Sequence, residues 1–114
     1  MATQLTILDP PLRILDTRDT NAQRLRDEGL TVTVPMADSA VGVEVTITMA
    51  GSQEPGHVTV WASGDQPEVS AVSAISGQTT SNTTTVPVDG GKFKLQVTKA
   101  NCFIIVDLVG IWAA

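Results

Sequence analysis

The clearest sign of the fold is V-G-V-E-V-T-I-T-M, residues 41–49, in which apolar and polar side chains alternate. Successive side chains of a β-strand point to opposite faces, so this pattern predicts a strand with one face in a core and one in water. The β-branched residues that dominate the segment favour strands over helices.

Similar segments lie on both sides of this strand. The turn residues at 50–56 are followed by V-T-V-W at 58–61, which predicts a hairpin between the two strands. Further strands are predicted at residues 30–35, 69–75, 83–88, 92–97 and 102–112. Glycines 90 and 91 after Asp89 predict a tight turn. No connection is long enough for a crossover helix, which favours antiparallel pairing.

Strands that recur about every ten residues are typical of a β-sandwich or barrel. The length of 114 residues suits one core. We therefore expect one all-β domain over residues 1–114, an antiparallel Ig-like or jelly-roll β-sandwich of roughly eight strands.

Charge and composition limit the partners. The net charge is −5 and only seven residues are Lys or Arg, which argues against nucleic acid and anionic membrane surfaces. The first residues lack a basic region and a long apolar run, so we expect no secretory signal and synthesis of a soluble protein inside a cell. The single cysteine, Cys102, excludes an intramolecular disulfide, and its apolar surroundings predict a buried thiol.

Patterns that carry chemistry are weak in this chain. His57 is the only histidine, and no Cys/His spacing resembles a zinc motif. The acidic residues form no EF-hand pattern, and no serine stands in a nucleophile elbow. We expect a non-enzymatic protein without a cofactor or metal.

Asp107 is the most informative charged residue. It interrupts the apolar run 103–111, so we expect its carboxylate to lie among hydrophobic neighbours. An unpaired buried carboxylate costs several kcal/mol. We therefore predict a structural ion pair of Asp107 with Arg13 or Arg18 that ties the first strand to the last.

The segment 16–29 departs from the strand pattern because it is densely charged. Thr20 or Asn21 could cap one helical turn that ends at Gly29; a solvated loop and a charged contact surface are the alternatives. The candidate partner contacts in this segment are Arg24, Arg26, Asp27 and Glu28.

The four aromatic residues are divided by the strand pattern. Phe93 falls on an apolar face and Phe103 in an apolar run, so both are predicted to be core. Trp61 has the opposite parity to Val58 and Val60, which makes it a candidate surface ring for a sugar or a protein, or a cover for one end of the sandwich. Trp112, near the chain end, is the other candidate contact.

Several segments together resemble a known β-sandwich module. P-L-R-I-L-D-T-R at 11–18 resembles its P-x-R-[LVI]-L-D-T-R opening, and V-D-L-V-G-I-W at 106–112 resembles its closing V-D-V-V-G-Y-F. Residues 43–48, 56–61 and 77–82 resemble its V-x-V-T-V-T, G-x-V-T-V-W/Y and G-Q-T-x-A-N segments. The module recurs in actinobacterial surface proteins and in virion proteins of actinobacteriophages. Two features depart from it: the loop after L-D-T-R is charged rather than rich in Gly and Pro, and Trp112 follows Ile111 where the module has Tyr-Phe.

The resemblance implies a non-enzymatic role in adhesion or virion architecture. A free-standing copy without a signal suggests a structural protein of a virion that is assembled in the host cytoplasm, most of all a capsid-surface decoration subunit. Its partners would be the major capsid protein, other virion subunits or further copies of itself. A tail or tail-tip subunit is one alternative, and a module that binds cell-wall glycan through Trp61 is another.

Overall fold

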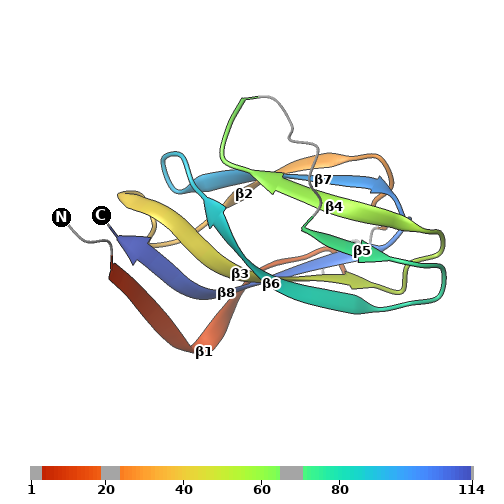
Figure 1. Ribbon diagram of the computed structural model, residues 1–114, viewed down its shortest axis with the longest axis horizontal. Helices are drawn as coiled ribbons and strands as arrows, with labels where there is room; N and C mark the ends of the chain where they lie inside the picture. The colour runs from red at the N-terminus through yellow and green to blue at the C-terminus, as the bar shows by residue number, and fades with distance from the viewer. Residues whose placement is uncertain (1–3, 19–23, 65–70, 114) are drawn as a thin grey trace.

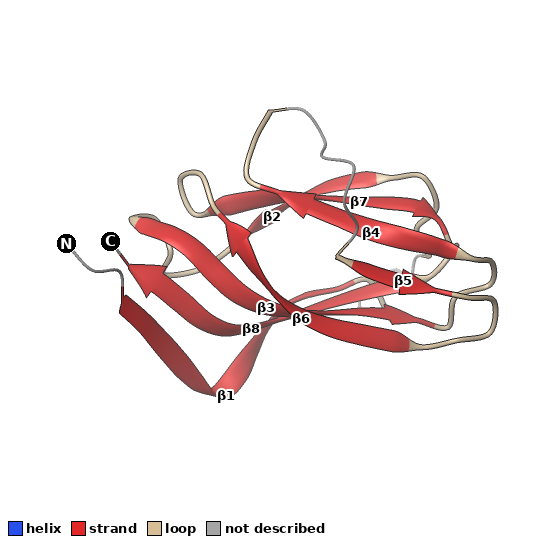
Figure 2. Cartoon of the chain, viewed as in Figure 1, coloured by secondary structure: helices blue, strands red, loops and turns tan. Residues whose placement is uncertain are grey.

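The protein is an all-β sandwich. The computed structural model describes residues 4–18, 24–64 and 71–113, and Figure 2 shows that these consist of strands and loops. The described residues contain no helix long and apolar enough to cross a membrane. In chain order the strands are β1 (Gln4–Asp16), β2 (Gly29–Thr33), β3 (Ala40–Ala50), β4 (Gly56–Trp61), β5 (Val72–Ala74), β6 (Thr80–Pro87), β7 (Lys92–Lys99) and β8 (Phe103–Ala113).

The strands form two antiparallel four-stranded sheets, which confirms the predicted sandwich. One sheet has the order β1-β8-β3-β6, and the other has the order β2-β7-β4-β5 (Figure 1). The pairs β1–β8, β2–β7, β3–β6 and β4–β5 are those of one long hairpin rolled up on itself. This is the jelly-roll arrangement. An Ig-like sandwich would instead pair its first two strands.

The predicted hairpin between residues 41–49 and 58–61 is wrong. β3 lies between β8 and β6, whereas β4 lies between β7 and β5 in the other sheet. The chain crosses between the sheets at residues 51–55, where the Ser52 Oγ lies 2.7 Å from the Glu54 carbonyl oxygen and 2.9 Å from the Ala100 carbonyl oxygen and shares its one proton between them. The N–H groups of Gln53 and Glu54 also donate to the Ala100 carbonyl, at 2.9 and 3.0 Å, so this segment bonds to the β7–β8 connection.

The core lies between the two sheets. Its largest fully buried side chain is Phe93, and Ile47, Met49, Leu95 and Ile104 are also fully buried. Phe93 and the apolar face of β3 were both predicted from alternation; Phe93 is confirmed as core, and so is the β3 face from Val43 to Met49. Val41, the first residue of that predicted face, is instead exposed. Cys102 is also fully buried, and this burial raises the pKa of its thiol to about 11.

Candidate functional site

The ion pair predicted at Asp107 joins the two strands that carry the chain ends. In β1, Arg13 faces Asp107 of β8, and its Nε atom lies 2.9 Å from Asp107 Oδ1. The pair lies on the outer face of its sheet, where the Asp107 side chain is 24% exposed. The expectation that Asp107 is enclosed by apolar neighbours is wrong, because only one face of β8 is turned to the core.

Arg18 has a different partner. Its guanidinium donates two hydrogen bonds to Asp16, at 3.0 and 2.9 Å, and its backbone N–H donates a third at 3.0 Å. Next to it, Thr17 accepts a hydrogen bond from the Ile104 N–H at 2.9 Å and donates its own N–H to the Ile104 carbonyl at the same distance. The L-D-T-R segment therefore fastens the end of β1 to the start of β8.

These contacts predict a loss of stability in acid. The bonds from Arg18 hold the pKa of Asp16 at about 2, below its ordinary 3.8, although burial of this carboxylate opposes the shift. A carboxyl group whose pKa is lower in the folded than in the unfolded chain stabilises the fold at pH values above its unfolded pKa. This stabilisation is lost as the pH falls from about 4 to about 2. The free energy of unfolding in urea should decline over this pH range in wild type and should depend less on pH in Asp16→Asn. Asp38→Asn, at an exposed carboxylate, is the control; equal profiles for the two variants would contradict the prediction.

Arg24 holds three segments together at one end of the sandwich. Its guanidinium donates to the Gly51 carbonyl, lies 3.4 Å from the Asn101 carbonyl oxygen, and stacks 4.4 Å from the centre of the Phe103 ring. The prediction that Phe103 is a core residue is therefore wrong. Phe103 lies half-buried on the outer face of β8, under the Arg24 cation.

The other charged candidates lie near the same end; Arg26 and Asp27 bond within the chain through their side chains, and Glu28 does so through its backbone. Arg26 pairs with Glu54 and Asp27, the Asp27 carboxylate accepts from the Lys99 N–H at 2.8 Å, and the Glu28 carbonyl accepts from the Val97 N–H at 2.9 Å. Thr20 and Asn21, the proposed helix caps, lie outside the described residues. The described residues 24–28 form no helix; Leu25 instead makes a bridge with Cys102.

Trp61 is half-buried beside a shallow groove over the β2-β7-β4-β5 sheet. The groove has a volume of about 180 Å³, and its lining includes Trp61, Thr31, Lys94 and Gln96. The indole N–H of Trp61 donates to the Gly64 carbonyl at 3.0 Å. A ligand here would therefore meet the face of the ring and the polar side chains around it.

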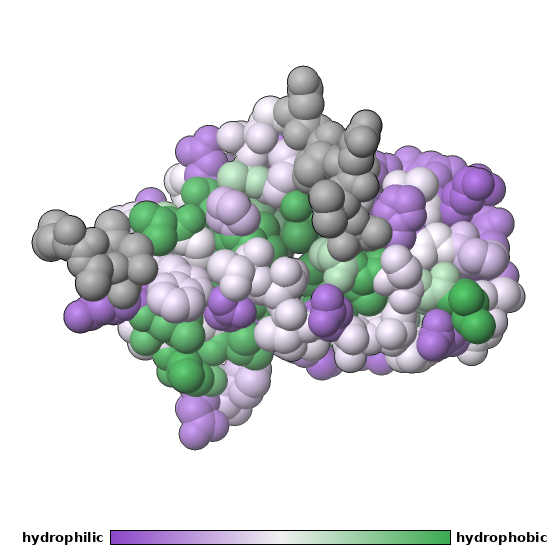
Figure 3. Space-filling view, in the orientation of Figure 1, coloured by the Kyte–Doolittle hydropathy of each residue, from purple (hydrophilic) through white to green (hydrophobic). Residues whose placement is uncertain are grey.

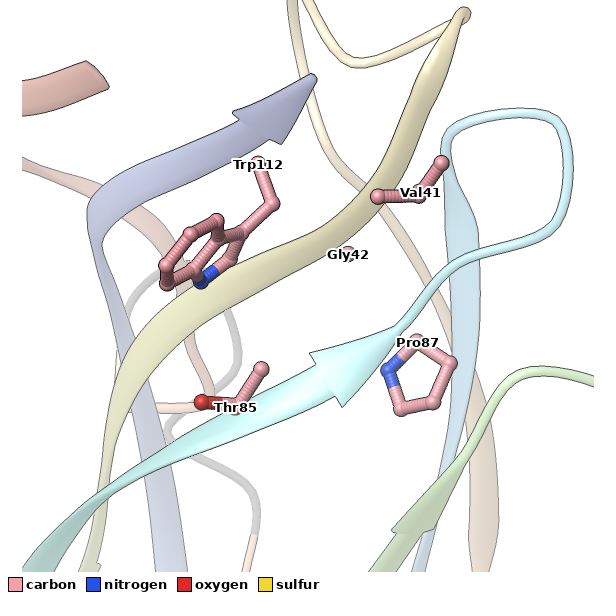
Figure 4. A pocket seen from close by; sticks show the side chains of 5 residues that line it. All are labelled: Val41, Gly42, Thr85, Pro87 and Trp112. Atoms are coloured by element: carbon pink, nitrogen blue, oxygen red, sulfur yellow. The ribbon is translucent and has the colours of Figure 1, made fainter. Parts of the chain in front are cut away.

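A second groove lies on the other sheet, beside Trp112. This Trp112 groove has a volume of about 310 Å³ and is lined by Val41 and Gly42 of β3, Thr85 and Pro87 of β6, and Trp112 of β8. Figure 4 shows the indole ring beside the β3 ribbon, with Thr85 and Pro87 across it on β6. The ring has this room because its register partner in β3 is Gly42.

Polar contacts fix the ring of Trp112. Its Nε1–H donates to Glu44 Oε1 at 2.8 Å, and the Thr85 hydroxyl donates to the same oxygen. The polar edge of the indole is thus satisfied within the chain, which leaves its apolar surface to line the groove.

Exposed apolar side chains adjoin the groove. Ile7 of β1 is 72% exposed, and Val41 and Leu5 are 46% and 37% exposed. Leu5 pairs with Trp112 and lies over Gly110, whose added Cβ would come within 2.8 Å of it. We call Leu5, Ile7, Val41, Pro87 and Trp112 the apolar end. Figure 3 shows green, hydrophobic surface on the side of the molecule where Figure 1 places the chain termini.

The candidate contacts therefore do not form one site. Trp112 and Trp61 lie on different sheets, and Arg24, Arg26 and Asp27 lie near the start of β8, at the opposite end of that strand from Trp112. The prediction from sequence missed Leu5, Ile7 and the contact of Glu44 with Trp112. The signal for Glu44 was present, since alternation places it on the wet face of β3, but its partner depends on strand order.

Among the described residues, no group of three or more His, Cys, Asp or Glu side chains is placed so that it could hold a metal ion. Comparison of the sequence with known families gives no matching family model. A search of characterised proteins also gives no match.

Proposed function

We propose that this chain is a non-enzymatic structural subunit of an actinobacteriophage virion that attaches to the capsid surface through its apolar end. The observation that carries the proposal is the group of exposed apolar side chains around the Trp112 groove. Single exposed apolar residues are ordinary, but several that neighbouring strands bring to one end of a sheet, beside a preformed groove, are typical of a contact with another macromolecule.

The chemistry of the groove favours a protein partner. Its lining is an indole face, a proline, a valine and a glycine, with one hydroxyl from Thr85 already donated to Glu44. It therefore offers shape and apolar contact rather than hydrogen bonds. Its volume suits one or two apolar side chains of a partner that also covers Leu5 and Ile7.

The family resemblance supports the place of action. Its most specific segments, 11–18 and 106–112, contain Arg13, Asp16, Arg18 and Asp107, which close β1 onto β8. These residues therefore belong to the framework that the resembling virion and surface proteins would share. The apolar end, in contrast, includes Trp112, where this chain departs from the module, as expected if each such protein has its own partner.

The proposal predicts that a charge at the apolar end weakens attachment. Ile7→Lys should reduce the affinity for purified capsids that lack the protein about tenfold or more, because a lysine ammonium would be desolvated in an apolar contact. Ile75→Lys, at a residue 65% exposed beyond β5, is the matched control and should bind like wild type.

Capsids without tails, tails without capsids and isolated actinobacterial cell walls are tested in parallel. Saturable binding to capsids that Ile7→Lys weakens supports the proposal. Binding to tails alone would make the chain a tail or tail-tip subunit. Equal capsid binding by Ile7→Lys and Ile75→Lys would refute the role of the apolar end.

A second candidate function rests on the Trp61 groove. An indole face flanked by Thr31, Lys94 and Gln96 is a suitable surface for a sugar ring, so this groove favours recognition of cell-wall glycan. Wall binding should then be saturable and should be abolished by Trp61→Ala but retained by Trp112→Ala. Tight wall binding by Trp61→Ala would eliminate this candidate.

A further inference from the structure

The four edge strands of the sandwich differ in how well they resist pairing with another chain. Short length, proline, charge and irregular register all protect an edge strand. β2 and β5 span only five and three residues. β1 contains Pro10 and Pro11, two register shifts and the charged pair Arg13–Asp107.

β6 has none of these protections along most of its length. Its eight residues, T-S-N-T-T-T-V-P, carry no charge, and proline occurs only at the end. It pairs with β3 without a register shift from Thr80 to Pro87. Within the described chain it has no strand on its other side. Figure 3 shows a mostly pale surface with separate purple patches across the middle of the molecule, where Figure 1 places β6.

The register shows which backbone groups face outward. The Val88 N–H donates to the Val41 carbonyl at 3.4 Å, directly after the last paired residues of β3 and β6. Hydrogen-bonded positions alternate along an antiparallel pair, so the even-numbered residues of β6 bond to β3. The N–H and C=O groups of Ser81, Thr83 and Thr85 therefore face away from β3, and all three side chains are exposed.

The outward-facing residues are complementary to themselves. With Thr83 opposite Thr83 of a second copy, Ser81 lies opposite Thr85 in both directions, and Asn82 lies opposite Thr84. Hydroxyl faces hydroxyl, and no like charges oppose each other. In this register Pro87, which lacks an N–H, lies outside the bonded pairs. Ser81, Thr83 and Thr85 can therefore each donate one backbone N–H to the second copy and accept one hydrogen bond from it.

We propose that two copies of this chain pair antiparallel through β6, about a two-fold axis at Thr83. The two β1-β8-β3-β6 sheets become one continuous eight-stranded sheet, and the closed two-fold symmetry leaves no β6 edge for a third copy. This inference stands apart from the capsid proposal. Thr85 and Pro87 also line the Trp112 groove, so the dimer would carry one groove on each side of the paired strands.

The test measures mass in solution and uses the self-contact of residue 83. Sedimentation equilibrium of wild type should give twice the chain mass of 12.0 kDa. Thr83→Lys and Thr83→Glu should each weaken dimerisation about tenfold or more, because like charges then face each other across the axis. An equimolar mixture of the two should form a heterodimer. Thr48→Lys, on the same face of the sheet but in the interior strand β3, should dimerise like wild type.

A covalent readout tests the register separately. Thr83→Cys should form an intermolecular disulfide on mild oxidation, since the Cα atoms of such a pair lie within disulfide range. Thr31→Cys, exposed on the edge strand β2, should not, and Cys102 is buried. A monomeric wild type, or a Lys variant and Glu variant that remain dimeric alone and gain nothing on mixing, would overturn the proposal. Capsid binding by a monomer would leave the proposed function intact while refuting the dimer.

Discussion

Gly56→Ala is expected to lower the free energy of unfolding by about 3 kcal/mol or more. Gly56 begins β4 and pairs with Lys99 of β7. An added Cβ would lie 2.3 Å from the Thr98 carbonyl oxygen and 2.4 Å from the Ala100 nitrogen. Both are backbone atoms, so relief requires β4 to separate from β7 at the crossing that Ser52 also fastens.

Chemical denaturation monitored by tryptophan fluorescence measures this effect. Gly64→Ala is the control: its added Cβ meets nothing within 4 Å, and only its φ of +80° opposes a side chain. That strain costs about 1–2 kcal/mol. If Gly56→Ala is no less stable than Gly64→Ala, the close approach of β4 and β7 is wrong.

Phe93→Ala is expected to lower the free energy of unfolding by about 3–5 kcal/mol, as for other large buried side chains. Phe93 is fully buried between the sheets, so its removal leaves a cavity that the strands cannot fill. Phe103→Ala makes the same chemical change on the outer face, where it removes the contact with Arg24. Its expected cost is about 1 kcal/mol.

The same denaturation experiment compares the two phenylalanine variants. Both remove one phenyl ring, so the difference between them reports the surroundings of that ring. Equal losses of stability would mean that Phe103 is as deeply placed as Phe93, in contradiction to the outer-face position of Phe103.

Alternation predicted strands well because it is a local property of the chain. Met49 of β3 and Phe93 of β7 could be assigned to the core because their strands alternate with a period of two residues, and this assignment needs no information on distant parts of the chain. It misassigned Phe103 because β8 is apolar on both faces: period alone cannot say which face meets the other sheet. Leu108 and Phe103 look alike in sequence, yet one is core and the other is covered by Arg24.

Strand partners could not be predicted in the same way. Residues 50–56 look like a hairpin turn, but in this topology most connections lead from one sheet to the other. The signal that distinguishes a crossing from a hairpin is long-range: Ser52 reaches Ala100, which is distant in sequence. The ion pair at Asp107 was predictable as far as the pair of strands, since both Arg13 and Arg18 lie in or next to β1, but the choice between them depends on register.

The candidate sites depended on strand order even more strongly. Trp112 and Trp61 were identified as aromatic residues without a clear place in the core. Their surroundings, Glu44 and Pro87 in one case and Lys94 in the other, come from strands that only the folded topology brings together. Residues of the apolar end such as Ile7 look like ordinary strand residues in the sequence.

The pairing of β1 with β8 has a mechanical consequence. Gln4 lies opposite Ala113, so both ends of the described chain leave the sandwich side by side. A force that pulls these two ends apart would load the hydrogen bonds between β1 and β8 one after another from that end, and not all at once. Such a joint opens at low force until the pull reaches Arg13 and Asp107. A subunit of this shape would bear load well when held by one of its faces, and poorly when stretched between its two ends.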